Sequence, residues 1–116
     1  MRLFHNPRCS KSRQALQLLH DAGVEPEVVE YLKTPPTAAG LDAICVALGR
    51  EPHTILRFGE DRAKELGLKA GDARSRSAWL KLMADNPVLI ERPIAIEGAR
   101  AALGRPPEAV LGLLQA

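Results

Sequence analysis

The sequence predicts an α/β fold in a single domain that covers residues 1–116. Extended segments stand near both ends of the chain, and a stripe of aliphatic residues at helical spacing follows the first of them. The middle of the chain reads as mostly helical. Aromatic residues make up only 3% of the chain, so we expect a core of aliphatic side chains.

The first third of the chain is predicted to form a β-α-β unit. The extended MRLFH segment stops at Asn6-Pro7, and a helix is expected over residues 10–22, with Gly23 at its C-terminal end. Residues 27–32, EVVEYL, are alternating and β-branched, as in a strand. A helix between two strands with short connections indicates a right-handed unit with parallel strands.

The middle of the chain is predicted to be a block of helices. Thr37, directly after two prolines, is expected to cap the first helix, and Gly49 is expected to end it. Ser77 is expected to cap the last helix of the block. The expected helical segments lie between Thr37 and Gly49 and over residues 54–58, 61–66 and 78–85.

The last third is predicted to return to strands and to end in a helix. The VLIERPIAI segment reads as extended, and a turn at Glu97-Gly98 leads to an antiparallel strand over residues 99–103. A final helix follows GRPP, with an apolar side of Val110, Leu113 and Leu114. The periodicity supports the α/β class. The order of elements is that of a thioredoxin-like βαβ…ββα core with a helical insertion between its halves.

Composition excludes several kinds of protein. The net charge of +2 is too balanced to favour nucleic acid or a membrane surface. The N-terminus lacks the apolar stretch of a signal peptide, and no apolar run approaches the roughly 20 residues of a membrane span. Two cysteines are too few for a disulfide framework, so we expect a cytoplasmic protein with reduced thiols.

The most informative motif is HNPRCSKSR, residues 5–13, in which one cysteine lies among cationic residues. Cys9 stands where the first strand meets the first helix, so the helix dipole and the free N–H groups of the first turn stabilise its thiolate. Acidic residues begin only at Asp21, and three cations of the motif favour the thiolate too: Arg8, Lys11 and Arg13. His5 can donate to the thiolate or position it.

A lone cysteine is most often a small buried hydrophobic residue, and both cysteines must be compared with that role. Cys45 shares a helical apolar stripe with Leu41 and Ile44, which predicts core packing. The position of Cys9 favours reactivity instead. We therefore expect Cys9 to react faster than Cys45 with an alkylating reagent.

The spacing around Cys9 separates three kinds of thiol chemistry. A dithiol oxidoreductase needs Cys-x-x-Cys, but Ser12 occupies the second cysteine position. A cysteine phosphatase needs Cys-x5-Arg, but Ala15 holds that place. What remains is monothiol chemistry, in which an external thiol completes the reaction. Scattered histidines and cysteines predict no metal site.

The HNPRCSKSR motif resembles the active-site motif of the glutaredoxin-coupled arsenate reductases, the ArsC family of the thioredoxin superfamily. The resemblance continues in VVEYLKTPPT, TILRFGEDRAKELGL, NPVLIERPIAI and GRPPEAVLGLL, and covers nearly the whole chain. In its length and in its PRCSKSR motif, the chain resembles the members of a short branch of the family. The resemblance implies one ArsC-like domain with a thioredoxin-like fold.

The resemblance also implies roles for particular residues. Cys9 matches the nucleophile, and His5 and Ser12 match residues that support its thiolate. Arg13 is expected to support the thiolate as well, because of its positive charge. Three arginines match residues that bind the oxyanion: Arg57, Arg92 and Arg105. Arginine suits this role because it donates forked hydrogen bonds to an ion such as arsenate, which carries about two negative charges near neutral pH.

The implied reaction is the reduction of arsenate to arsenite, a step of arsenic detoxification. The thiolate attacks arsenate, water leaves, glutathione attacks the adduct, and glutaredoxin supplies the reducing step. The resemblance thus implies arsenate or a similar oxyanion as substrate, glutathione as co-substrate and glutaredoxin as partner. We expect no bound cofactor, no nucleic-acid or membrane partner, and a monomer.

Two other functions fit the same sequence. One is a monothiol glutathione-dependent oxidoreductase without arsenate activity, which needs Cys9 but not the three arginines together. The other is a non-catalytic binding module, because relatives of the family act as transcription regulators that bind RNA polymerase. On the fold itself, we expect the Arg92–Pro93 peptide to be cis, as thioredoxin-like folds often have before this strand.

Overall fold

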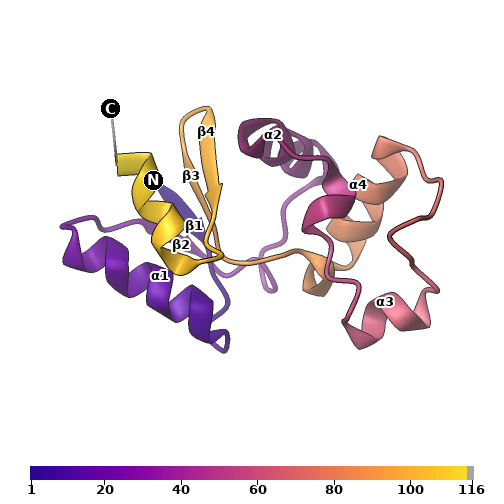
Figure 1. The fold of residues 1–116 in the computed structure, drawn as a ribbon, viewed down its shortest axis with the longest axis horizontal. Coiled ribbons are helices and arrows are strands. Elements are labelled where there is room, and N and C mark those ends of the chain that lie inside the picture. Colours follow the sequence, from indigo (N-terminus) through magenta and orange to yellow (C-terminus); the bar gives the residue numbers. More distant parts are fainter. Residues whose placement is uncertain (115–116) are drawn as a thin grey trace. The chain divides into compact units, whose positions relative to one another are not determined.

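The structure, a computed structural model, describes residues 1–114, and the chain divides into two compact units (Figure 1). One unit comprises Met1–Thr34 and the chain from Arg92 onward. The other comprises Pro35–Glu91, which is the helical insertion that the sequence predicts. Each unit has its own buried side chains and is described by itself.

The first unit is built on a four-stranded sheet in the order β2-β1-β3-β4. Strand β1 pairs parallel with β2 and antiparallel with β3, and β3 pairs antiparallel with β4. Leu3, in the centre of β1, lies opposite Val28 and Ala95. The strands are β1 Arg2–Phe4, β2 Glu27–Val29, β3 Ile94–Glu97 and β4 Arg100–Leu103. This arrangement confirms the predicted α/β, thioredoxin-like core.

Two helical elements pack against one face of this sheet: α1, Ser10–Asp21, and the 3-10 helix η3, Pro107–Leu114. Their apolar sides meet the sheet in a cluster of buried residues: Leu3, Ala15, Leu19, Ala95, Val110 and Leu113. Helix α1 ends as predicted, because Gly23 adopts φ +81 directly after the C-cap. The cluster holds α1 against the sheet through Ala15 and Leu19, and Cys9 stands at the N-terminal end of this anchored helix.

Two predictions in the first unit are wrong in detail. Strand β2 ends at Val29 rather than at residue 32, because the chain turns there and the N–H groups of Lys33 and Thr34 donate to the carbonyl of Glu30. Leu114 is 41% exposed and does not join the apolar side of the last helix. With three residues per turn, a 3-10 helix aligns Val110 with Leu113 and turns the next residue away.

The second unit is helical. Its elements are α2 Ala38–Leu48, η1 Pro52–Ile55, α3 Asp61–Glu65, α4 Arg76–Asp85 and η2 Pro87–Leu89. Thr37 caps α2 as predicted, since its Oγ1 accepts a hydrogen bond from the Gly40 N–H at 3.0 Å. Gly49 ends α2 in the left-handed region, with φ +67.

Three boundaries in the second unit differ from the predictions. Ser75, not Ser77, caps α4, because Arg76 in the first turn is held by ion pairs to Asp42 at 2.8 Å and Glu51 at 3.2 Å. The helix expected over residues 54–58 is instead η1, and the extended segment near Val88 begins with η2. In both short elements proline stands in the first turn, where its fixed φ starts a helical turn.

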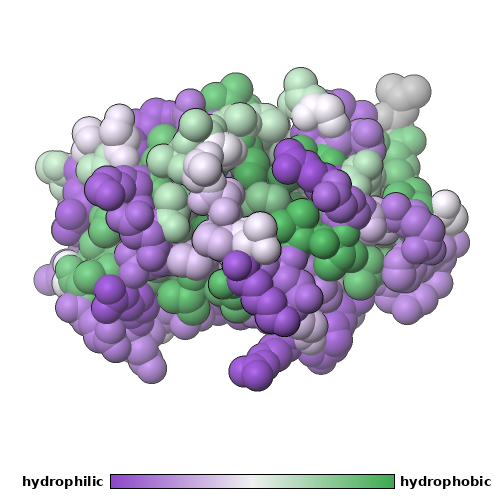
Figure 2. Space-filling view, turned by 180° about the vertical axis from the view of Figure 1, so that it is seen from behind, coloured by the Kyte–Doolittle hydropathy of each residue, from purple (hydrophilic) through white to green (hydrophobic). Residues whose placement is uncertain are grey.

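The surface carries small apolar areas among polar residues. Figure 2 shows hydrophilic and hydrophobic residues interspersed on the face that it displays. The large hydrophobic side chains that stand exposed in the described chain are Val28, Leu32, Val46 and Leu114. Over residues 1–114, every helix is too short or too polar to cross a membrane.

Candidate active site

A tight loop at residues 6–9 places Cys9 at the start of α1. The Asn6 carbonyl accepts the Cys9 N–H at 3.0 Å, and the Asn6 side chain accepts the Arg8 N–H at the same distance. The Cys9 carbonyl then accepts the Arg13 N–H at 3.0 Å, which is the first bond of the helix. Cys9 is thus the N-cap residue, with extended backbone at φ −93 and ψ 122.

The thiol of Cys9 lies at the positive end of a 12-residue helix and is 9% exposed. Within the described chain it makes no capping hydrogen bond, so it leaves the N–H groups of the first turn to another acceptor. The Arg13 guanidinium donates to the Pro7 carbonyl at 3.0 Å and braces the loop. This setting suits a thiolate that receives an anionic substrate.

His5 and Ser12 form a buried pair beside this loop. Ser12 Oγ lies 2.7 Å from His5 Nδ1 and accepts the Asn6 N–H at 3.0 Å. Burial lowers the pKa of His5, Arg13 lowers it further, and Glu30 opposes the shift. The imidazole is therefore neutral at neutral pH, and one hydrogen bond joins its Nδ1 to the Ser12 hydroxyl. The pair ties the end of β1 to the first turn of α1.

The lowered pKa of His5 predicts a pH-dependent stability. The unfolded chain takes up this proton near the ordinary pKa of 6.5, whereas the folded chain takes it up at lower pH. The free energy of unfolding should therefore fall as the pH drops from about 7.5 to about 5. His5→Asn places an amide group where the imidazole Nδ1 stands, but asparagine does not titrate. Urea unfolding should therefore show a smaller fall in the free energy of unfolding for this variant. Equal falls in both proteins would contradict the prediction.

Arg105 brings a guanidinium to the thiol. Its Nη2 lies 4.0 Å from Cys9 Sγ, and its Nε donates to the Arg92 carbonyl at 2.9 Å. The Arg92–Pro93 peptide that supplies this carbonyl is cis, as predicted, and so is Arg105–Pro106. Two of the three predicted arginines therefore meet near Cys9, Arg105 with its side chain and Arg92 with its backbone.

Gly104 is a positioning residue that sequence reasoning missed. A Cβ atom at this position would lie 2.5 Å from Pro93 Cγ and 3.1 Å from Pro93 Cδ. Because glycine has no Cβ, its N–H reaches the Pro93 carbonyl at 2.8 Å. This close approach sets where Arg105 leaves the backbone. The available signal was a glycine directly before the arginine of GRPP.

Gly104→Ala is expected to destabilise the protein by about 1–3 kcal/mol, the usual cost of forcing a methyl group into a packed site. The ring of Pro93 cannot yield easily, since that residue is among the fully buried ones. Urea unfolding measures the loss. Gly71→Ala is the matched control, because a Cβ there meets nothing within 4 Å. Equal stability of the two variants would contradict the assigned role of Gly104.

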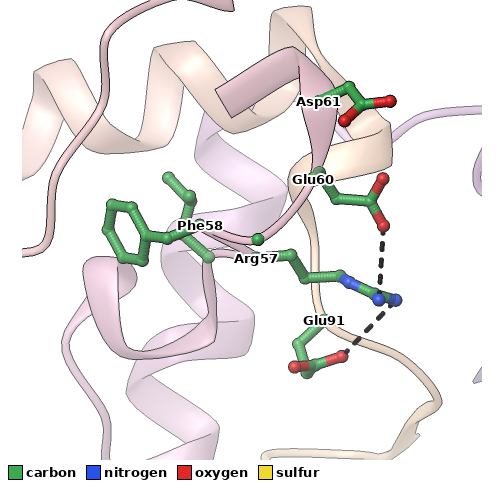
Figure 3. Close-up of a pocket in the computed structure, with 7 residues that line it drawn as sticks. Arg57, Phe58, Glu60, Asp61 and Glu91 are labelled. Carbon is green, nitrogen blue, oxygen red and sulfur yellow. Dashed lines mark ion pairs between the residues drawn. The ribbon is translucent and has the colours of Figure 1, made fainter. Parts of the chain in front are cut away.

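Arg57 belongs to the second unit, where its guanidinium lies beside two glutamates. Its Nη2 lies 3.2 Å from Glu60 Oε1, and its Nη1 lies 3.8 Å from Glu91 Oε1 (Figure 3). The Arg57 side chain is 24% exposed. The guanidinium is thus paired with two carboxylates, which the sequence reasoning did not foresee.

The other chemical groups fit structural roles. Cys45 is fully buried in α2, which confirms its predicted core position, and burial raises the pKa of its thiol. Both cysteines are free thiols. Over residues 1–114, no three His, Cys, Asp or Glu side chains gather in a way that could hold a metal ion.

Comparison with known proteins assigns the family. The sequence model of the ArsC family matches residues 4–113. This chain belongs to the ArsC family. The loop with Cys9 and the segments with Arg57, Arg92 and Arg105 all lie within the matched range of the ArsC chain.

Individual relatives match over nearly their whole length. The ArsC chain is 48% identical over 115 residues to the "Uncharacterized protein YfgD" of Escherichia coli K12, covering 98% of this chain and 96% of the relative. It is 44% identical to an arsenate reductase of Neisseria meningitidis serogroup B, covering 98% and 97%. A solved arsenate reductase of Vibrio cholerae superimposes with a TM-score of 0.90 at 43% identity, covering 96% of this chain and 94% of that one.

Proposed function

We propose that this protein is an arsenate reductase in which Cys9 is the nucleophile. The observation that carries the proposal is the approach of Arg105 Nη2 to Cys9 Sγ, at 4.0 Å, at the start of α1. A cation and a helix N-terminus beside one thiol favour both the thiolate and an incoming oxyanion. The relatives named arsenate reductase, at more than 40% identity, support arsenate as that oxyanion.

The proposed reaction transfers two electrons from two thiols to one arsenic atom. The Cys9 thiolate attacks arsenic(V) and forms an S–As bond, while one oxygen leaves as water. Attack by an external thiol then forms a disulfide, and the electron pair released reduces arsenic(V) to arsenic(III). Arsenite leaves, so the net change is one arsenate and two thiols to one arsenite, one disulfide and one water.

Other residues of the first unit have proposed supporting roles. Arg105 stabilises the negative charge that builds on oxygen during the attack, and the side chain of Arg92 does the same. His5 and Ser12 support the thiolate by fixing the turn that bears it, while Arg13 adds positive charge to the loop. Arg57, in the second unit, is proposed as an oxyanion ligand from its match to the family motif.

We propose glutathione and glutaredoxin as the external thiols. The replacement of a second active-site cysteine by Ser12 supports this choice, because Cys45 is buried and fits the core. Two free cysteines are in keeping with a reducing compartment, so we place the protein in the cytoplasm, acting as a monomer without a bound cofactor.

The test is arsenite production from arsenate by the purified protein. Full turnover should require arsenate, glutathione and glutaredoxin together, and omission of either thiol component should reduce it to background. Turnover that continues without glutaredoxin would overturn the proposed coupling. If the folded protein makes no arsenite with all components, the reductase proposal fails. Glutathione mixed disulfides would then be measured as the activity of a monothiol oxidoreductase.

A further inference from the structure

The hollow around Arg57 has an unusual composition for the binding of an anion. It has a volume of about 470 Å³ and lies wholly within the second unit. In Figure 3 the side chains of Glu60 and Glu91 point toward the guanidinium, whereas Asp61 points away. One positive and two negative groups give this triad a net charge of −1 when all are ionised. Such a triad repels an ion that offers only acceptor oxygens.

Backbone hydrogen bonds bring the positions of Arg57 and Glu91 together. The Arg57 N–H donates to the Leu89 carbonyl at 2.7 Å, and the Glu91 N–H donates to the Ile55 carbonyl at 2.8 Å. The segments that carry Arg57 and Glu91 therefore run side by side. Glu60 stands at the N-cap of α3 but makes no capping bond, and its carboxylate turns to Arg57 instead. The charges are preorganised by the fold.

The two ion pairs of Arg57 are unequal. Glu60 lies within hydrogen-bond distance at 3.2 Å, so it anchors the guanidinium. Glu91 lies at 3.8 Å, which is too far for a hydrogen bond. Arg57 Nη1 is buried and has no hydrogen-bond partner within the described chain. The Glu91 side of the guanidinium thus holds a donor that an oxygen atom of a ligand would satisfy.

We propose that Glu91 is a specificity-determining residue that selects a protonated tetrahedral oxyanion. This inference rests on the proposed role of Arg57 as an oxyanion ligand. Arg57 donates to one oxygen of the ion, and the Glu91 carboxylate accepts a hydrogen bond from an O–H of the same ion. Arsenate and phosphate retain a proton at neutral pH and can make both bonds. Sulfate has none to donate, so it meets the carboxylate as a like charge.

The test compares anion binding by calorimetry at neutral pH, in a Cys9→Ser background that cannot react. The parent should bind arsenate at least about tenfold tighter than sulfate, because a site built for an O–H rejects an analogue without one. Glu91→Gln should tighten sulfate binding by about tenfold and change arsenate binding much less, so that the preference disappears. Glu65→Gln is the matched control, since Glu65 pairs with Arg62 elsewhere in the unit.

The binding measurements and the reductase assay can fail independently of each other. Equal binding of arsenate and sulfate by the parent, or equal changes for both ions in Glu91→Gln, would overturn the inference. An arsenite-producing wild type with such binding would leave the proposed function standing. A parent that prefers arsenate, with no arsenite made by wild type, would support the inference and defeat the function.

A second measurement needs no variant and so does not depend on how well Glu91→Gln folds. Phosphate should displace arsenate from the Cys9→Ser protein at similar concentrations, because it shares the protonated tetrahedral form. Sulfate should need at least about tenfold more. Displacement by sulfate as efficient as that by phosphate would overturn the inference.

Discussion

Replacement of Cys9 by serine is expected to abolish arsenate reduction, with a fall in kcat of about 10⁴-fold or more. The serine hydroxyl occupies nearly the same space but stays protonated at neutral pH, and it cannot form the S–As bond from which the electron pair is later recovered. The loop would still form, because its hydrogen bonds use the backbone of Cys9 and not the sulfur. The variant should therefore be folded and inactive.

The matched control for this variant is Cys45→Ala. Cys45 is buried in α2 and takes no part in the proposed reaction, so the control should keep wild-type kcat while it remains folded. Arsenite production with glutathione and glutaredoxin measures both. Residual turnover in Cys9→Ser, or a loss of turnover confined to Cys45→Ala, would remove Cys9 from the role of nucleophile.

Arg105→Ala is expected to lower kcat/KM for arsenate by about 10²–10³-fold, the usual cost of one donor that stabilises an oxyanion. The side chain approaches Cys9 Sγ and is itself held by the Arg92 carbonyl, so its charge is fixed at the reacting sulfur. Arg105→Lys keeps the charge but loses the fork that spans sulfur and carbonyl. We expect its activity to lie between those of wild type and Arg105→Ala.

Two further measurements separate this role from general effects. Lys33→Ala removes an exposed cation elsewhere in the same unit and should change kcat/KM little. Alkylation of Cys9 at one neutral pH should be slower in Arg105→Ala than in wild type, because the guanidinium that approaches the sulfur is gone. An unchanged alkylation rate together with unchanged kcat/KM would exclude Arg105 from the site.

The sequence predicted the features that depend on near neighbours. Thr37 capped α2, Gly23 and Gly49 ended helices, and the order of elements led to the observed sheet, because each signal acts within a turn or two of the chain. The position of Cys9 at the start of α1 followed from the same kind of signal. It was therefore predictable without any knowledge of tertiary contacts.

What the sequence did not predict depends on distant partners. The N-cap of α4 at Ser75 accompanies the ion pairs of Arg76 with Asp42 and Glu51, which are far away in the chain. The close approach of Gly104 to Pro93 likewise joins two separate segments. Spacing along the chain carries no information on such contacts, since they exist only once the elements have packed.

The pairing of Arg57 was also hidden, although only in part. Glu60 stands three residues after Arg57, a spacing at which side chains can pair locally, but it was not among the predicted site residues. Glu91 is brought close only by the pairing of Leu56 with Ile90, which connects the middle of the helical unit with its last residues. The match to a family motif made Arg57 a site candidate, whereas its counter-ions are visible only in the fold.

The buried thiol of Cys45 can be used to measure local unfolding of the helical unit. Its sulfur can meet a reagent only when α2 separates from the rest of the helical unit, because the residue has no exposed surface in the folded state. Its labelling rate in increasing denaturant would therefore measure the opening free energy of that unit alone. Cys9 is expected to react in the folded state, so the measurement is made on Cys9→Ser, in which Cys45 is the one remaining thiol.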